Sequence, residues 1–446
     1  MRRLLACLTA AAAALAGLTA AAPPATAADS GAFTALTYNV AGLPESISSA
    51  PTPRGPSTTE IGRRAAPYDV VHVQEDFNHH ALLYAADTTH PYRTPTSGGA
   101  GIGSGLNTLS RIPYDEDDFE RVHWGACRFD SGDCLTPKGF TFTRERLAEG
   151  VYVDFYNLHT NAGTSEGDLA ARAANLNQLT AFIGTHSAGN AVVVMGDTNT
   201  RYTRAGDTIA EFAAANRLSD PWVDLVRGGV PPAKGSDPLL CDQSLPTVPD
   251  TCEVVDKVLY RGSALVSLRA TSYRNEHAAF LTGDGLMLSD HDPVAVGFSW
   301  SRNPAFRASD PFGGPHGAHF NDIDRLPAGA RATTLALRAG ARIDAMALTL
   351  ADGTALAHGG SGGTASSLTL GAEEYLTTAH LCRAQRDGRS RIFHARFTTN
   401  LGRTLAGGTP TSDCVTHTAP PGWQITAFHG RAAEEIDKIA FLETRR

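Results

Sequence analysis

Polar clusters that directly follow short apolar segments are the feature that most constrains how this chain can fold. Four such segments are residues 32–40 (AFTALTYNV), 68–74 (YDVVHVQ), 151–158 (VYVDFYNL) and 191–195 (AVVVM). Their β-branched and aromatic content is typical of strands, and residues 253–260 and 292–300 predict two more. Apolar residues at helical spacing predict a helix over 168–183. Strands that alternate with helices favour a layered α/β fold.

The two ends of the chain differ from this pattern. Arg2 and Arg3 precede an apolar stretch, and small residues at 25–27 (ATA) follow it, which predicts a signal peptide over residues 1–28 and a secreted, extracellular protein. A membrane anchor is the alternative, disfavoured because the apolar run is short and is interrupted by Pro23 and Pro24. Residues 301–311 read as a linker, and the Gly-rich alternating segments of 312–446 predict an all-β domain after the α/β domain of 29–300.

Cysteine and charge patterns narrow the function class. Secretion favours disulfides, and removal of Cys7 leaves six cysteines whose proximity pairs Cys127 with Cys134, Cys241 with Cys252, and Cys382 with Cys414, among fifteen connectivities. The cysteines and histidines are not clustered at the spacing of zinc ligands, so a zinc site is disfavoured. Residues 29–300 hold 20 Lys and Arg against 33 Asp and Glu, so no strong nucleic-acid track is evident.

The residues at the strand ends predict a phosphoryl-transfer site. The strand ends carry carboxylates, amides and two histidines: Asn39, Glu75, His159, Asn161, Asp197, Asn199, Asp256, Asp290 and His291. Oxygen ligands without cysteine suit Mg²⁺, with Ca²⁺ or Mn²⁺ as alternatives. Histidines beside carboxylates suit acid–base catalysis near neutral pH. Together these groups predict hydrolysis of a phosphodiester by an activated water.

The same segments carry a family resemblance. TYNVAG, VVHVQED, NLHTNAG, VVVMGDTN, VDKVLY and LSDHDPV, within residues 33–300, resemble the motif series of the deoxyribonuclease-I-like endonuclease/exonuclease/phosphatase superfamily. The resemblance implies an α/β four-layer sandwich, with two sheets flanked by helices. It also implies roles. The metal ligands are Glu75, Asn39 and Asp290. The catalytic residues are His291 as general base, Asp256 as the group that orients it, Asp197, Asn199, and His159 toward phosphate or leaving group.

Within the superfamily, three segments resemble the bacterial neutral sphingomyelinases. CRFDSGDCLTPKGF resembles their stapled loop, which implies that Lys138 contacts phosphate with Asn161 nearby, and the helix after His159 is also similar. AAFLTGDGLML resembles a hairpin that enters membranes, which implies peripheral membrane contact by Phe280 and Leu281. The expected substrate is therefore a phospholipid or another phosphodiester. A secreted nuclease and a carbohydrate-binding adhesin with an inactive catalytic domain are the alternatives.

The C-terminal region carries a second resemblance. GGPHGAHFND, HGGSGG, FTTNLGR and FHGRAAEEIDKIAFLE are similar to the jacalin-like lectins. This implies an all-β prism of three four-stranded sheets and a glycan site that includes Gly314 and Asp437. Ala433 stands where the family has a glycine, so glycan binding remains open at this point.

Overall fold

The computed structural model describes residues 28–98, 102–129 and 132–446, so the predicted signal peptide lies outside the described residues apart from its last position. The N-terminal domain contains two sheets. The six-stranded sheet has the order β10-β11-β1-β2-β4-β3 and the five-stranded sheet the order β5-β6-β7-β8-β9. Their strands are β1 Ser30–Asn39, β2 Val70–Gln74, β3 Tyr92–Arg93, β4 Asn107–Ser110, β5 Glu120–His123, β6 Gly139–Ala148, β7 Val151–His159, β8 Ala191–Asp197, β9 Asp256–Arg261, β10 Val266–Asn275 and β11 Val294–Arg302.

The two sheets pack face to face through an apolar core. Phe33 on β1 contacts Phe155 on β7 edge to face, with 5.8 Å between ring centroids. Val70, Val192 and Val194 belong to the same buried cluster. The central strands β2 and β8 are buried along their whole length and are almost continuously apolar rather than alternating, which is why the sequence marks them clearly.

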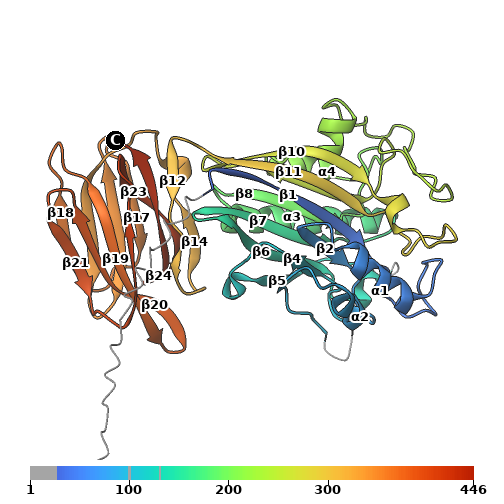
Figure 1. The fold of residues 1–446 in the computed structure, drawn as a ribbon, viewed down its shortest axis with the longest axis horizontal. Coiled ribbons are helices and arrows are strands. Elements are labelled where there is room, and N and C mark those ends of the chain that lie inside the picture. Colours follow the sequence, from blue (N-terminus) through green and yellow to red (C-terminus); the bar gives the residue numbers. More distant parts are fainter. Residues whose placement is uncertain (1–27, 99–101, 130–131) are drawn as a thin grey trace, which may run out of the picture.

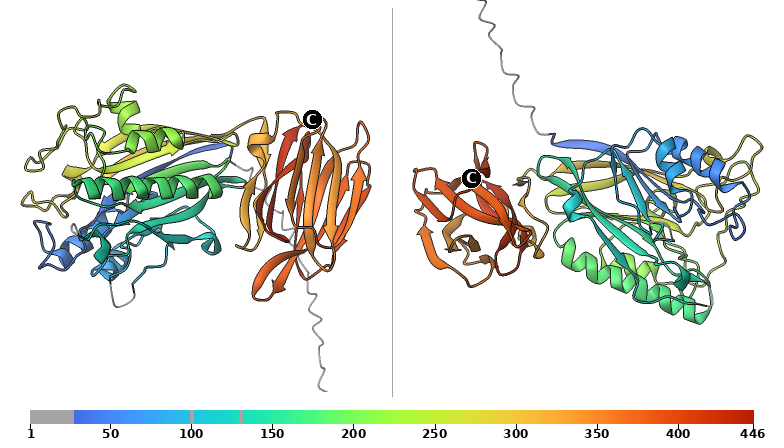
Figure 2. Two further views of the ribbon diagram at one scale, coloured as in Figure 1. Left: turned by 180° about the vertical axis from the view of Figure 1, so that it is seen from behind. Right: turned by 90° about the horizontal axis from the view of Figure 1, so that it is seen from below.

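Helices cover the outer faces of the two sheets (Figures 1 and 2). They are α1 Arg54–Arg64, α2 His80–Ala86, α3 Glu166–His186 and α4 Ile209–Ala215. Phe182 of α3 packs on Phe140 of the five-stranded sheet at 4.9 Å, and Ile61 of α1 joins the cluster on the six-stranded sheet. The predicted four-layer sandwich is therefore confirmed. No helix in the described ranges has both the length and the apolar content needed to span a bilayer.

The C-terminal domain is all-β, as predicted. Its strands are β12 Phe306–Ala308, β13 Phe312–Gly313, β14 Ala318–Asn321, β15 Ala332–Ala339, β16 Ile343–Leu350, β17 Ala355–Gly359, β18 Thr364–Thr369, β19 Leu376–Arg386, β20 Arg389–Thr399, β21 Thr404–Gly408, β22 Asp413–Thr418, β23 Trp423–Ala432 and β24 Ile436–Arg445. They form a four-stranded and a nine-stranded sheet instead of three separate four-stranded sheets. One bridge, Leu376 with Ile425, joins β19 to β23 and so merges two faces of the prism.

The stretch expected to be a linker, residues 301–311, is structured. It contains the end of β11 and strand β12, which pairs antiparallel with β24. Asp310 accepts hydrogen bonds from Tyr152 Oη and Gly150 N, both at 2.8 Å, and pairs with Arg146. The two domains are therefore tied together at the chain crossing (Figure 1).

A buried ion-pair network completes the interface between the domains. The Asp118 carboxylate of the N-terminal domain pairs with Arg431 at 2.9 Å and with Lys438 at 2.8 Å. Burial raises the pKa of Asp118, but Lys438 and the nearby Arg144 more than offset this, so the carboxylate stays charged. Asp115 also pairs with Lys438, at 2.7 Å, but its side chain is 48% exposed.

We predict that Asp118→Ala lowers the free energy of unfolding by about 3–5 kcal/mol, because it removes the buried carboxylate that Arg431 and Lys438 share. Asp115→Ala should cost under about 1 kcal/mol, since the exposed carboxylate is solvated when unpaired. Differential scanning calorimetry of the full chain measures both. Equal effects of the two substitutions would show that the Asp118 network does not stabilise the interface.

Candidate active site

The polar residues singled out in the sequence gather at one end of the sandwich, at the ends of strands from both sheets. β1 and β2 bring Asn39 and Glu75 from the six-stranded sheet, and β7 and β8 bring His159 and Asp197 from the five-stranded sheet. This end lies away from the C-terminal domain (Figure 1). Parallel pairing of β1 with β2 and of β7 with β8 places these strand ends side by side.

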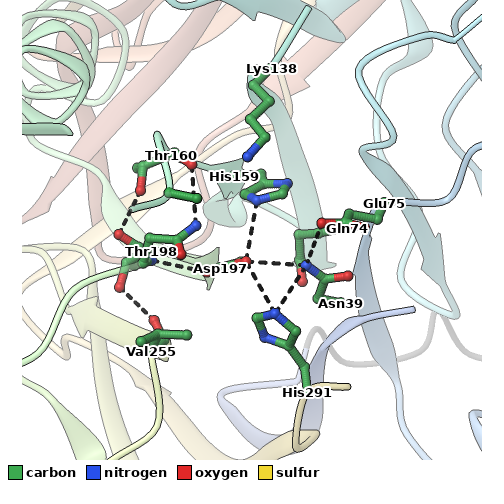
Figure 3. Close-up of polar contacts among 12 residues, drawn as sticks. Asn39, Gln74, Glu75, Lys138, His159, Thr160, Asp197, Thr198, Val255 and His291 are labelled. Carbon is green, nitrogen blue, oxygen red and sulfur yellow. Dashed lines mark hydrogen bonds and ion pairs between the residues drawn. The ribbon is translucent and has the colours of Figure 1, made fainter. Parts of the chain in front are cut away.

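Asp197 is the centre of the cluster (Figure 3). Its Oδ2 accepts a hydrogen bond from Asn39 Nδ2 at 3.1 Å, and it lies 3.2 Å from His159 Nε2 and 3.8 Å from His291 Nε2. Burial raises the pKa of Asp197, but His159 and His291 more than offset this and lower it overall. A charged carboxylate is thus held where the two sheets meet.

His291 is poised to exchange a proton. Its Nδ1 lies 2.8 Å from Asp256 Oδ2, so the N–H donates to the carboxylate and Nε2 faces the site. Burial lowers the pKa of His291, but Asp256 and Asp197 more than offset it, so the pKa lies well above its usual range. Ligand atoms of Asp197, Asp256 and His291 all lie within 4.8 Å of one another.

Two site residues have left-handed backbones. Glu75 has φ 55° and Asn199 has φ 49°, a region that non-glycine residues rarely adopt. The Asn199 backbone N–H donates to Asp197 Oδ1 at 2.9 Å. Strained backbone of this kind concentrates at functional sites, where the surrounding structure enforces it. The fold therefore gives up some stability to hold both side chains at the cluster.

The donors around Glu75 fit a hard divalent cation. Asn39 Nδ2 lies 3.2 Å from Glu75 Oε1, and burial raises the pKa of Glu75 despite the opposing effect of Lys138. A partly buried carboxylate with a raised pKa is stabilised by a nearby cation, and amide and carboxylate oxygens are the ligands that Mg²⁺ prefers. Asp290 is held by the Ser49 hydroxyl at the edge of this group.

His159 and Lys138 form the opposite side of the site. The His159 Nε2 faces Asp197, and its Nδ1 is buried without a hydrogen-bond partner among the described residues. Burial, with Lys138 adding to it, lowers the pKa of His159 to about 3, so the ring is neutral. Lys138 extends toward His159 (Figure 3) and is paired with Asp133.

Three supporting residues were missed by the sequence reasoning. Trp124 Nε1 donates to the His159 carbonyl at 2.6 Å, Ser49 contacts Asp290, and Asp133 pairs with Lys138. Trp124 and Ser49 act across 35 or more positions of sequence, and no local pattern marks such contacts.

Three predicted site residues have other surroundings in the structure. Asn161, expected to bind substrate, accepts from Arg128 N at 2.8 Å and donates to Asp168 Oδ1 at 3.1 Å, so its side chain holds a loop in place. Phe280, expected to contact a membrane, is 2% exposed and packs on Tyr38 at 5.0 Å. Leu281 is half-buried, and its carbonyl accepts from Arg64. The expected membrane contact at Phe280 is therefore wrong, because the hairpin folds back onto the sheet.

The predicted sugar-binding pair lies together in the C-terminal domain. Gly314 N donates to the Asp437 carbonyl at 2.8 Å, and a Cβ at Gly314 would collide with Ser390. The Asp437 carboxylate is 1% exposed and pairs with Arg391. A glycan that used Asp437 would have to replace this ion pair, so sugar binding stays a prediction.

All three predicted disulfides are present. Cys127–Cys134, Cys241–Cys252 and Cys382–Cys414 have Cα–Cα separations of 5.3, 5.1 and 4.0 Å. The first closes the loop ahead of Lys138, and the last joins β19 to β22 in the C-terminal domain. Proximity in the sequence was therefore sufficient to predict the connectivity.

Curated relatives match one part of the chain. Sphingomyelinases of Mycobacterium bovis and Mycobacterium tuberculosis are 41% identical over 278 residues, which make up 61% of this chain and 53% of theirs. The chain thus spans about half the length of the curated relatives that it matches.

Matches to solved structures cover each region separately. The beta toxin of Staphylococcus aureus is 18% identical and covers 59% of this chain and 99% of its own, with a TM-score of 0.41. A Malaysian banana lectin variant is 24% identical and covers 32% of this chain and 99% of its own, with a TM-score of 0.29.

Family models match within both domains. Residues 58–227 match endonuclease/exonuclease/phosphatase family 2, and residues 309–442 match the jacalin-like lectin domain. The chain therefore contains a region similar to the endonuclease/exonuclease/phosphatase family, followed by a region similar to the jacalin-like lectin domain.

Proposed function

We propose that this chain is a secreted, metal-dependent phosphodiesterase that hydrolyses a phospholipid of the sphingomyelin type. The observation that carries the proposal is the cluster around Asp197, in which a His291–Asp256 pair and an Asn39–Glu75 pair face each other across one carboxylate. The His291–Asp256 pair supplies proton transfer, and the Asn39–Glu75 pair supplies a cation site. Attack of water on a phosphodiester requires both.

The chain's own residues divide the reaction between them. In its neutral form, His291 accepts a proton from the attacking water at Nε2, and Asp256 stabilises the imidazolium that forms, since it accepts from Nδ1. Asn199 and Asp197 position the water and the phosphate. Lys138 brings a positive charge toward the developing negative charge on the phosphate oxygens. Neutral His159 holds Asp197 through Nε2.

Glu75 and Asn39, with Asp290 nearby, would hold the cation. Mg²⁺ fits this oxygen-only donor set best, and Ca²⁺ and Mn²⁺ belong to the same class. When bound, the ion neutralises charge on the phosphate oxygens.

Two observations favour a lipid over nucleic acid as the substrate. The relatives with 41% identity are named sphingomyelinases. The N-terminal domain also has 13 more acidic than basic residues between 29 and 300, which disfavours a polyanionic duplex. The three disulfides are consistent with secretion. The complete cluster argues against an adhesin whose catalytic domain is inactive.

We expect Glu75→Gln to reduce hydrolysis at least ~100-fold while the protein stays folded, because it removes the charge that holds the cation without changing the side-chain size. Chelation with EDTA should reproduce the loss, and added Mg²⁺ should reverse it for the wild type alone. Glu60→Gln, which changes a partly exposed carboxylate on α1 that is paired with Arg64 and lies outside the cluster, is the matched control and should keep full activity. Full turnover in excess EDTA would refute the metal requirement.

We expect activity to fall as the pH is lowered through the pKa of His291, because the protonated ring cannot accept a proton. Asp256→Asn removes the carboxylate that raises this pKa, so the acid limb of the kcat/KM profile should move to lower pH. Asp220→Asn replaces an equally buried carboxyl that does not act on His291 and should leave the limb in place. His291→Ala should cost ~10²–10⁴-fold in rate. If the acid limb of the kcat/KM profile does not move in Asp256→Asn, His291 is not the general base.

We expect the purified chain with Mg²⁺ to hydrolyse sphingomyelin in vesicles faster than double-stranded DNA at equal phosphodiester concentration. Release of phosphocholine and the cleavage of plasmid DNA measure the two reactions. Glycerophospholipid vesicles, assayed in parallel, define the head-group and backbone preference. Rapid DNA cleavage without phospholipid hydrolysis would identify the chain as a secreted nuclease instead.

A further inference from the structure

Arg54 is the first residue of α1, and its exposed fraction is 0%. None of the described carboxylates forms an ion pair with its guanidinium, and Glu45 accepts from the Arg54 backbone N–H instead. Burial lowers the pKa of Arg54. A buried cation without an ion-pair partner is costly, and the first turn of a helix, where the helix dipole is positive, is an unfavourable place for it. Stability alone therefore does not explain an arginine at this position.

The Arg54 guanidinium joins three segments of the chain. Its Nη1 donates to the Val40 carbonyl at 3.2 Å, and its Nη2 donates to the Leu288 carbonyl at 2.8 Å. Nε and Nη2 also donate to the Thr52 carbonyl, at 3.1 and 3.0 Å. The planar fork of an arginine reaches acceptors in several directions at once, whereas a lysine presents one compact ammonium. Arg54 thus ties together segments that are far apart in the sequence.

Two of these segments lead directly into the candidate active site. Val40 follows Asn39, and Leu288 stands two positions before Asp290. Asn39 and Asp290 are two of the proposed cation ligands, and they come from opposite ends of the N-terminal domain's sequence. The hydrogen bonds of Arg54 go to backbone carbonyls and to Thr52, not to the two ligand side chains. Any effect of Arg54 on the cation site is therefore transmitted by the backbone.

Two hydroxyl groups reinforce the same connection. Ser289 Oγ donates to the Asn39 carbonyl at 2.6 Å, and Thr52 Oγ1 donates to the Met287 carbonyl at 2.8 Å. Residues 281–293, which include a proposed cation ligand and the proposed base, belong to no helix or strand. The hydrogen-bond ladder of the sheet therefore does not fix their position, and these side-chain hydrogen bonds hold them instead.

We propose that Arg54 is a positioning residue that holds Asp290 in register with Asn39, so that both can bind one cation beside Glu75. The inference rests on the proposed metal-dependent hydrolysis. Groups that orient metal ligands without touching the metal are worth about 10–100-fold in metal affinity or activity. A misplacement of about 1 Å by a change away from the reacting atoms can cost about 100-fold in rate. A buried arginine that adds little to stability is explained by this role.

The test uses the full chain and Arg54→Lys, which keeps the positive charge but cannot reach Val40 and Leu288 together. Binding of Mn²⁺ to the metal-free protein, measured by electron paramagnetic resonance, should weaken about 10–100-fold. Hydrolysis of the soluble diester bis(4-nitrophenyl) phosphate at subsaturating Mg²⁺ should fall about 10–100-fold as well. Ile61→Val alters a buried side chain of the same helix and is the matched control, which should leave both measurements at the wild-type level.

Thr52→Val keeps the test decisive if Arg54→Lys does not fold. Valine has the branched shape of threonine but lacks the hydroxyl that donates to Met287 and accepts from Arg54. Thr52→Val should weaken Mn²⁺ binding in the same direction as Arg54→Lys, by a smaller factor, because the guanidinium itself remains. Thermal melting followed by circular dichroism establishes which variants are folded at the assay temperature.

The two measurements separate this inference from the proposed function. Wild-type Mn²⁺ affinity and hydrolysis in folded Arg54→Lys would overturn the inference and leave the proposed function intact. Equal losses in Arg54→Lys and Ile61→Val would also overturn it, since general destabilisation would then be the cause. Weakened Mn²⁺ binding in Arg54→Lys, from a wild type that hydrolyses no phosphodiester, would uphold the inference and refute the proposed function. A wild type that binds no Mn²⁺ would refute both.

Discussion

The carboxylate of Asp197 is the contact on which the active-site end of this protein depends. It is buried at the end of β8 in the five-stranded sheet. It accepts a hydrogen bond from Asn39 of the six-stranded sheet and contacts His159 of the five-stranded sheet. A buried carboxylate is tolerated only when it is hydrogen-bonded or paired. The same partners that satisfy Asp197 therefore fix the relative position of the two sheets, and the proton-transfer pair and the cation pair are aligned by one group.

The sequence was most informative where a strand end met a polar cluster. Asn39, Glu75, His159, Asp197 and His291 were all placed correctly near one another, because strands buried on both faces are recognisable and their ends converge in an α/β sandwich. Disulfide pairing was also predictable, since each pair is close in sequence or across neighbouring strands.

The errors arose where burial, rather than pattern, decides a residue's role. AAFLTGDGLML has the composition of an exposed hairpin, but Phe280 fills a space beside Tyr38 that only the folded sheet creates. Asn161 follows His159 as a site residue would, yet its amide oxygen accepts from Arg128 in the stapled loop and its amide nitrogen donates to Asp168 at the start of α3. The segment at 301–311 looks like a linker because its partners, β24 and Arg146, are distant in sequence.

The left-handed backbones of Glu75 and Asn199 have a consequence for how this domain could be altered. Glycine at either position would relieve strain of the order of 1 kcal/mol. A library selected for thermal stability alone would therefore enrich glycine at the positions of the proposed cation ligand and the proposed water-positioning amide. Selection for thermal stability would favour glycine at these two positions, whereas selection for catalytic activity would favour Glu75 and Asn199.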